Sequence, residues 1–225
     1  MKHLLYFLAC TLCLLSCSSK NKKESNKQNQ YFPLNKGNQW VYEASIKYHQ
    51  KETDSLMEQK IEWTMEVTDT LHRGKNIAAI IKGFPTDLVW FEGTALRGDY
   101  ILLQDSNKIY LNNMVSKDSL VSRFRDMKDS LTDLKYNGDI LFDFPLKLHK
   151  TWGAEEDMPA RSDSMYEWVV KKESTDTSAA EIQYMTNPDH SIFQFQPNIG
   201  ITGYYFEHHG TVMELRMKLV RKTLH

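Results

Sequence analysis

Three histidines in the last part of the chain come closest, by type and spacing, to a metal or acid–base site. His208 and His209 are adjacent, and His190 ends the stretch Asn187-Pro188-Asp189-His190, which is typical of a turn. Adjacent residues of a strand point to opposite faces, so His208 and His209 cannot easily bind one ion. A stable zinc site needs three or four converging ligands. We therefore predict no metal site and interpret the histidine pair as the polar end of a strand.

A second group of residues that could do chemistry is acidic. Glu155-Glu156-Asp157 and Asp163 lie in the polar stretch from Gly153 to Ser164. Two carboxylates can hydrolyse a glycoside if a cleft holds them apart at the right separation. The composition here is that of an exposed loop, so we expect solvated carboxylates. The linear motifs of serine hydrolases, zinc proteases, phosphate-binding loops, EF-hands and dinucleotide-binding folds are missing, and we predict a non-enzymatic protein without a cofactor.

Aromatic side chains could instead line a pocket for a sugar or an apolar ligand. The chain has five tryptophans, at Trp40, Trp63, Trp90, Trp152 and Trp168. All but Trp90 occupy matching positions in the two halves described below, which favours core packing. Trp90 and Phe91 are neighbours, so one of these rings is expected at the surface or at a cavity mouth. Tyr100-Ile101-Leu102-Leu103 is apolar on both faces. The predicted ligand-binding residues are Trp90, Phe91, Tyr100 and Leu102.

The N-terminal segment carries a recognisable address. A short basic start and an apolar run from Leu4 to Leu15 end in Leu14-Leu15-Ser16-Cys17. The run is shorter than the roughly 20 apolar residues that span a bilayer. The junction resembles the lipobox of bacterial lipoproteins, although Leu15 is bulkier than the small residue usual at its position. The resemblance implies cleavage before Cys17 and lipidation of that residue; the alternative is an ordinary secretory signal with an incidental cysteine.

Residues 1–16 are thus a predicted signal peptide and residues 17–30 a lipidated, flexible tether, because Ser18 to Gln30 contains no large apolar residue. All three cysteines (Cys10, Cys13 and Cys17) fall in or at the end of this segment. A disulfide, a thiol nucleophile or a Cys-ligated zinc is therefore excluded further along the chain.

Lipoprotein sorting rules suggest which membrane holds the anchor. By resemblance to sorted lipoproteins, Ser18 in place of Asp after the modified cysteine implies the outer membrane, reached through the lipid on Cys17. The acidic run that marks surface export in some lipoproteins is also missing after Cys17. We therefore predict attachment to the periplasmic face of the outer membrane.

Residues 31–225 are predicted to form one β-rich domain. The chain has 225 residues, of which 41% are hydrophobic and 25% charged, enough for one sizeable core. The net charge of −1 gives no reason to expect a nucleic-acid partner. From Gln59 to Thr70, and again from Thr211 to Val220, apolar and polar residues alternate, as in half-buried antiparallel strands. We predict an all-β, mainly antiparallel domain in the form of a curved sheet or an incomplete barrel.

One stretch has a different period. Its apolar residues step by four, three, four and three positions and are Leu120, Phe124, Met127, Leu131 and Leu134. This spacing places them on one helical stripe, with Ser116 as the N-cap and Asn137-Gly138 as the C-terminal stop. We predict one long amphipathic helix near 117–135 that covers a face of the sheet. A partner-binding or lid helix is the alternative.

A repeated motif predicts internal duplication. Phe32-Pro33-Leu34 and Trp40 recur as Phe144-Pro145-Leu146 and Trp152, each residue 112 positions later. A second offset, of 105, pairs Glu62-Trp63 with Glu167-Trp168, Thr70 with Thr175, Ile77 with Ile182, Gly98 with Gly203, and Tyr100 with Tyr205. We predict pseudo-repeats at about 31–115 and 143–225, joined by a helix at 116–136. Chance identity between two β-rich segments is the alternative for the second offset.

Several of these features together suggest a family. The lipobox, the polar tether, Phe-Pro-Leu-x5-Trp-x-Tyr at 32–42 and Pro197-Asn198-Ile199-Gly200-Ile201 resemble a broad group of uncharacterised bacterial lipoproteins. The resemblance spans nearly the whole chain, but its motifs are structural and imply no activity. At the level of fold alone, the chain is similar to periplasmic carriers and acceptors of lipoproteins, which curl an antiparallel sheet around an apolar cavity.

We predict a non-enzymatic, membrane-anchored binding or accessory lipoprotein of the cell envelope, whose partner is an apolar ligand or another envelope protein. The first alternative is a carrier-like module that holds an apolar ligand in its concave face. The second is a hydrolase of envelope glycans or peptides, which requires a cleft with two converging carboxylates or a His–carboxylate pair. The third is a structural subunit with a large exposed apolar patch.

Overall fold

The computed structural model describes residues 31–53, 55–113, 116–126, 132–136, 138–153, 166–176, 178–186, 189–209 and 212–225. Within these ranges one antiparallel sheet of twelve strands accounts for most of the chain. The strands are β1 (Gln39–Gln50), β2 (Ser55–Arg73), β3 (Asn76–Lys82), β4 (Asp99–Asp105), β5 (Lys108–Asn112), β6 (Asp139–Asp143), β7 (Thr151–Trp152), β8 (Trp168–Lys172), β9 (Ala180–Met185), β10 (His190–Gln196), β11 (Gly200–Glu207) and β12 (Val212–Thr223). The predicted all-β, antiparallel fold class is confirmed.

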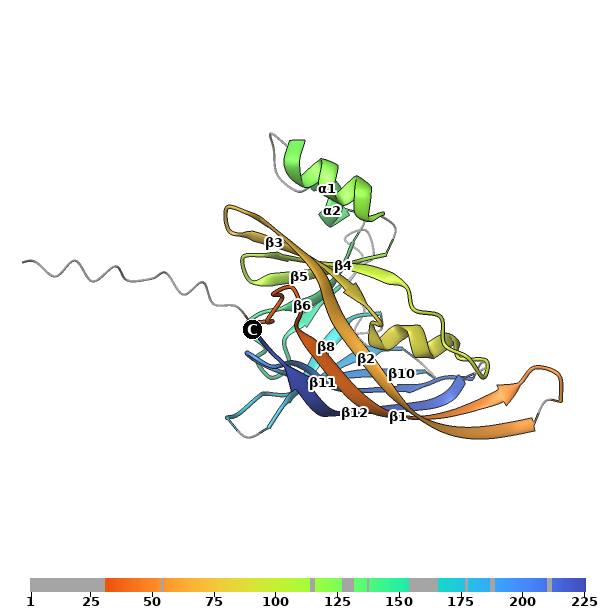
Figure 1. Ribbon diagram of the computed structural model, residues 1–225. Coiled ribbons are helices and arrows are strands. Elements are labelled where there is room, and N and C mark those ends of the chain that lie inside the picture. Colours follow the sequence, from red (N-terminus) through yellow and green to blue (C-terminus); the bar gives the residue numbers. More distant parts are fainter. Residues whose placement is uncertain are drawn as a thin grey trace, which may run out of the picture.

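The sheet consists of two meanders that meet at the first and last strands. Its order is β6-β5-β4-β3-β2-β1-β12-β11-β10-β9-β8-β7. β1 and β12 pair in the middle, from Gln39 opposite Thr223 to Tyr48 opposite Val212. The sheet curls strongly (Figure 1), so that its two edge strands, β6 and β7, approach each other. Trp152 Nε1 donates a hydrogen bond to the Ile140 carbonyl at 3.0 Å across this gap. The result is a nearly closed barrel with one seam.

Aromatic rings fill the interior of the barrel. Phe195 lies 4.7 Å from Phe142 and 5.6 Å from Phe32 between ring centroids. Phe193 lies 5.9 Å from Phe142 and 6.1 Å from Phe84. All five rings are buried, and they form one continuous set of contacts through a single hydrophobic cluster. Tilted and edge-on ring pairs of this kind add stabilisation beyond the area they bury.

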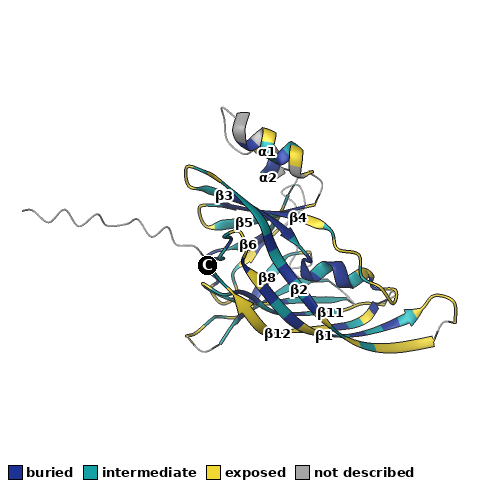
Figure 2. Ribbon diagram, in the orientation of Figure 1, coloured by how far each residue is buried: buried dark blue, intermediate teal, exposed yellow. Residues whose placement is uncertain are grey.

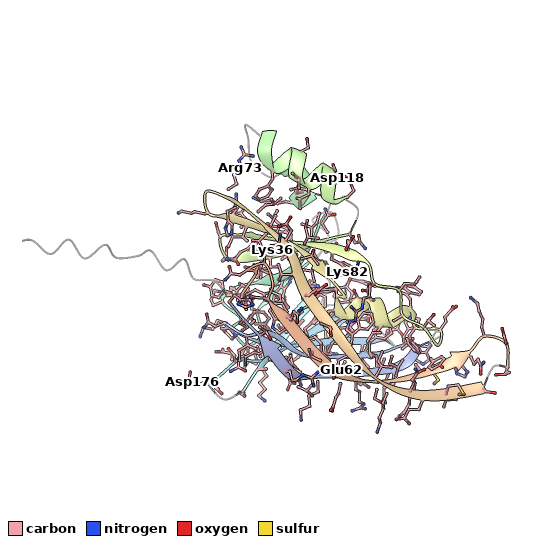
Figure 3. The ribbon with its side chains drawn as sticks, viewed as in Figure 1. Lys36, Glu62, Arg73, Lys82, Asp118 and Asp176 are labelled. Atoms are coloured by element: carbon pink, nitrogen blue, oxygen red, sulfur yellow. The ribbon has the colours of Figure 1, made fainter. Side chains whose placement is uncertain are left out.

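A smaller hydrophobic cluster lies on the outer face of β3 and β4. The inward residues of β3 join the main core, whereas Ala78 and Ile80 face outward and pack with Ile101 and Leu103 of β4. Leu120 and Phe124 of α1 (Lys117–Asp126) and Leu134 of α2 (Thr132–Tyr136) cover this patch. The two helices lie outside the sheet, and Arg73 of β2 lies beside α1 (Figures 1 and 3).

The prediction of one long helix is wrong, because the described residues form two short helices. Met127 and Leu131 lie outside the described residues. In a straight helix the 14 residues between Leu120 and Leu134 would span about 21 Å. Among the described residues, the sheet side of the outer cluster consists of Ala78, Ile80, Ile101 and Leu103, with Leu71 and Tyr110 packed at its margins. A second helix brings Leu134 back to the same small patch that Leu120 covers.

The two motifs that carry the family resemblance form one structural unit. Trp40 Nε1 donates to the Ile199 carbonyl at 2.6 Å, and the Asn198 amide donates to the Tyr31 carbonyl at 3.0 Å. Gly200 lies against the ring of Phe32. The two motifs therefore pack against each other, one at the start of the domain and the other in the turn between β10 and β11.

The topology bears on the predicted repeats without testing them. Trp40 and Trp152 are buried on the first strand of each meander, and Trp63 and Trp168 lie on the second strand of each. The offset of 105 then fails to follow the strand order, because it pairs β4, the fourth strand of its meander, with β11, the fifth of the other. Common ancestry of the two halves remains a prediction.

Gly200→Ala should destabilise the domain strongly. Gly200 has φ +99, and a Cβ there would lie 2.3 Å from Phe32 Cε2. Left-handed strain and overpacking together predict a loss of about 2–5 kcal/mol in the free energy of unfolding. The matched control is Gly74→Ala, at φ +58 with no atom within 4 Å of the new Cβ; it should cost about 1–2 kcal/mol. Equal losses in urea denaturation would contradict the packing argument.

Candidate functional site

The 3-10 helix η1 (Pro85–Trp90) positions Trp90, the predicted ligand residue that is most exposed. Leu88 is fully buried, and η1 packs against β12 inside the curve of the sheet (Figure 1). Pro85 at the helix start fixes the entry of the chain. Trp90 at the far end is 81% exposed. A large indole held in water by a buried helix is a candidate contact surface for a ligand.

The other three predicted ligand residues lie in or against the core. Phe91 is buried and packs edge-on against Tyr48 at 5.1 Å between ring centroids. Leu102 is fully buried in the main cluster. The Tyr100 hydroxyl donates to Asp87 Oδ1 at 2.7 Å. The structure therefore does not bring these side chains together with Trp90 in one open site.

The two-sided apolar stretch at 100–103 has a structural explanation. Leu102 points into the barrel, whereas Ile101 and Leu103 belong to the outer cluster beneath α1 and α2. β4 is covered on both faces, by the aromatic core on one and by helices on the other. No bound ligand is needed to account for this pattern.

Asp87 anchors the loop that follows Trp90. Its carboxylate accepts hydrogen bonds from the Tyr100 hydroxyl and from the Gly98 amide, the latter at 3.2 and 3.3 Å to its two oxygens. Burial raises the pKa of the Asp87 carboxyl from its ordinary value, and the hydrogen bonds from Tyr100 and Gly98 oppose this rise. Burial and the hydrogen bond to Asp87 raise the pKa of Tyr100 to about 12, so Tyr100 is the donor at neutral pH.

A cleft of about 330 Å³ opens beside Trp90, between η1 and the ends of β9, β10 and β11. Its aromatic wall is formed by Trp90, Tyr184 and Phe206, and its polar wall by Asp189, Ser191 and His208. A larger groove of about 560 Å³ lies on the outer face of β1, β2 and β12, among charged side chains such as Glu43 and Lys60. The first cleft combines aromatic and convergent polar groups, as binding sites commonly do.

Asp189 organises the polar wall. Its carboxylate lies 3.1 Å from His208 Nε2 and 3.5 Å from His209 Nδ1. The ring of His208 also stacks on Phe206. The expectation that the two histidines point to opposite faces of a strand is wrong, because β11 ends at Glu207 and alternation ends with it. Both imidazoles turn toward one carboxylate.

Hydroxyl groups form a second polar pair. The hydroxyls of Ser191 and Tyr204 lie 3.0 Å apart, and burial raises the pKa of Tyr204 to about 12. His190 Nδ1 lies 3.3 Å from Gln183 Nε2. The Ser191 hydroxyl pairs with Tyr204 and the His208 imidazole with Asp189, unlike the serine and histidine of a catalytic triad, which pair with each other.

Within the described ranges, no group of three or more histidines, cysteines or carboxylates is arranged to hold a metal ion. The acidic residues Glu155-Glu156-Asp157 and Asp163 lie outside those ranges, as does Cys17. No helix in the described part of the chain is long and apolar enough to cross a membrane.

The cleft lies at the end of the barrel opposite the start of the domain. The Asn38 side chain holds His225 and Pro33 together, through bonds of 2.7 Å to the His225 amide and to the Pro33 carbonyl. His225 lies just beyond the last residue of β12, and Pro33 and Asn38 lie beside it. The cleft lies near the opposite end of β12, where β11 ends and β12 begins. Twelve residues of β12 span about 35 Å at the usual rise of a strand.

Sequence patterns identified Trp90 but missed Asp87 and Asp189. Asp189 precedes His190 in a turn that the sequence marks clearly, but its partner His208 is 19 positions away, just after the end of β11. Asp87 follows Gly83-Phe84-Pro85-Thr86 in a stretch typical of a loop, and nothing local indicates that its carboxylate is buried.

Two solved structures are similar to this chain. A protein of Bacteroides fragilis NCTC 9343, provisionally named an exported protein with a YmcC-like fold, aligns with a TM-score of 0.41 and 13% identity over 86% of this chain and 98% of its own. A protein of Parabacteroides distasonis ATCC 8503, provisionally named a lipoprotein, gives 0.35 and 12% over the same shares. At these TM-scores the likeness carries no argument about function. No protein-family model and no curated protein matches the chain.

The stability of the loop anchor should depend on pH through Asp87. Since the pKa of Asp87 is raised in the folded protein, the folded state binds this proton more tightly than the unfolded chain does. Its contribution to the free energy of unfolding therefore grows as pH falls from 7 toward the unfolded value of about 4. Asp87→Asn removes this titration, so its stability relative to the native protein should be highest at neutral pH and should decline on acidification.

Tyr100→Phe provides a check on the sign. The Tyr100 hydroxyl lowers the pKa of Asp87, so its removal should steepen the gain in stability on acidification. Chemical denaturation at several pH values measures both variants. A flat difference between Asp87→Asn and the native protein would contradict the assignment.

Proposed function

We propose that this chain is a non-enzymatic binding lipoprotein, anchored by Cys17 to the periplasmic face of the outer membrane. The observation that carries the proposal is the cleft beside the exposed Trp90, at the end of the barrel remote from the start of the domain. The lipobox at residues 14–17 supports the anchor. With the tether attached at Tyr31, the cleft lies at the end of the domain far from the attachment point.

The filled interior favours a surface cleft over a deep lipid cavity. A carrier that encloses an apolar ligand needs a concave face lined by side chains that the core does not use. Here the rings of Phe142, Phe193 and Phe195 occupy the interior and contact one another. The cleft by contrast is small and partly polar, which suits part of a sugar or peptide more than an acyl chain.

The second candidate is a hydrolase of envelope glycans or peptides. It is favoured by one observation, the pairing of His208 with Asp189 inside the cleft. A histidine oriented by a carboxylate is the usual general base of hydrolytic sites. It ranks second because Ser191, a cleft hydroxyl that could serve as the nucleophile, pairs with Tyr204.

Acrylamide quenching of tryptophan fluorescence tests the cleft. Trp40, Trp63 and Trp152 are buried, and Trp168 is half-buried against Tyr184, so Trp90, which is 81% exposed, should dominate the quenchable emission. Fractions of envelope extract that contain small glycans, peptides or lipids are added in turn to the full chain. A glycan or peptide fraction should reduce the quenchable emission, and Trp90→Phe should abolish this effect. The control variant is Leu96→Ala, an exposed residue of the following loop that lies outside the cleft.

The outcomes separate the candidate functions. If only the lipid fraction protects Trp90 from acrylamide, the result would favour a carrier of an apolar ligand. Conversion of a protected fraction into smaller products, abolished by Asp189→Asn, would favour the hydrolase. If no fraction protects Trp90, the cleft is not a binding site and the proposed function fails.

Cys17→Ser tests the anchor. The variant should lose labelling by radioactive palmitate and should leave the membrane fraction of a Gram-negative host, because lipidation requires the thiol. Cys13→Ser is the matched control, since it lies within the predicted signal peptide and should change neither result. Retention of Cys17→Ser in washed membranes would contradict a lipid anchor at this residue.

A further inference from the structure

β2 has an open edge along its first half. β1 pairs with β2 from Ser55 to Glu66, but β3 pairs with it only from Glu66 onward. Gly83 lies against the carbonyl of Thr64 and marks where the loop after β3 begins to cover the edge. Among the described residues no strand pairs with the other side of residues 55–62. The backbone groups along this edge can accept another strand.

The open edge belongs to a projecting arm. The hairpin formed by the end of β1 and the start of β2 extends beyond the barrel, and Figures 1 and 2 show it as a largely exposed ribbon. Leu56 is 58% exposed and Met57 41% exposed. Large apolar side chains beside an unpaired strand edge favour contact with a partner.

The two faces of the arm differ in charge. Trp63 points into the core, so Met57, Gln59 and Ile61 share the concave face of the sheet. Glu58, Lys60 and Glu62 share the convex face, on which Glu62 (Figure 3) lies 2.7 Å from Arg221. Along the edge, the side chains of the convex face are therefore acidic, basic and acidic in turn.

This alternation can be complementary to itself when two copies of the edge pair antiparallel. In a symmetric antiparallel pair of β2 edges, each residue faces a residue whose side chain points to the same side of the sheet. The two-fold axis therefore passes between the two copies of a single residue, which face each other. An axis at Gln59 places Glu58 opposite Lys60 of the second copy, twice by symmetry. It also places Met57 opposite Ile61 on the concave face. Both kinds of cross-strand pair are stabilising.

The neighbouring registers are unfavourable. An axis at Lys60 would place two lysines opposite each other and Glu58 opposite Glu62. An axis at Glu58 would place two glutamates opposite each other. Like charges in direct cross-strand contact destabilise a sheet. An axis at Ile61 would again place Lys60 opposite Glu62, but it would confine the pairing to residues 60–62 of the open edge, because Gly83 lies against the Thr64 carbonyl. The charge pattern and the extent of the open edge together favour the register centred on Gln59.

We propose that two copies of this chain associate through antiparallel pairing of their β2 edges at residues 55–62, centred on Gln59. The pairing joins two barrels into one continuous sheet and covers Leu56 and Met57. The contact is short, so the dimer depends on concentration. Lipid anchors in one membrane raise the effective concentration of the copies.

Charge exchange tests the pairing on the chain from Ser18 onward, which keeps every described strand and has no cysteine. Sedimentation equilibrium should show a monomer–dimer equilibrium that weakens with added salt. Glu58→Lys and Lys60→Glu each convert both ion pairs into like-charge pairs, so each should weaken dimerisation about tenfold or more. The double variant E58K/K60E should restore dimerisation, and a mixture of the two single variants should form the heterodimer.

A disulfide tests the register. Gln59→Cys should form a covalent dimer under mild oxidation, because residues at the axis face each other. Glu43→Cys is the control: Glu43 is exposed on the same sheet, but β1 has a strand on both sides. A chain that stays monomeric at all concentrations would overturn the proposal. The charged residues of the open edge would then serve to prevent edge-to-edge aggregation. A dimer that both single variants leave intact, or that crosslinks equally at residue 43, would also overturn it.

Discussion

The packing of aromatic rings inside the barrel is the constraint on which the rest of the structure depends. Phe32, Phe142, Phe193 and Phe195 come from both meanders and meet in one cluster. A twelve-stranded sheet could curl around an open cavity, but these rings occupy the space. Because the interior is filled, the candidate binding groups lie at the rim of the barrel. There η1 holds Trp90 in solvent, and the Asp189 carboxylate lies near two histidines.

The fold class could be predicted from the sequence because period-two alternation is a local signal. The alternation from Ile61 to Thr68 describes half-buried strands whatever their neighbours. That the described residues form α1 and α2 in place of one long helix could not be predicted in this way. The stripe from Leu120 to Leu134 is regular, but the patch that it must cover is small, and the size of that patch depends on how β3 and β4 pair.

The candidate site was predictable only in part, for a related reason. Two adjacent aromatics at Trp90 and Phe91 indicated that one ring faces solvent, and the structure places Trp90 there. Tyr100 and Leu102 attracted attention because their strand is apolar on both faces. That pattern has two physical causes, a ligand on one face or a second layer of protein, and only the position of α1 and α2 distinguishes them. Contacts between residues far apart in the sequence, such as that of Asp189 with His208, leave no local pattern.

The pairing of β1 with β12 has a consequence for how the protein is made. Among the strands that the structure describes, β1 is the first to be synthesised and β12 the last, yet the two pair with each other. The first meander can form early, but β1 at its edge keeps unpaired backbone groups until β12 arrives. Such late, long-range closure slows folding and exposes the nascent barrel to misassociation. Any chaperone that assists this fold would thus be needed most before β12 has joined the sheet.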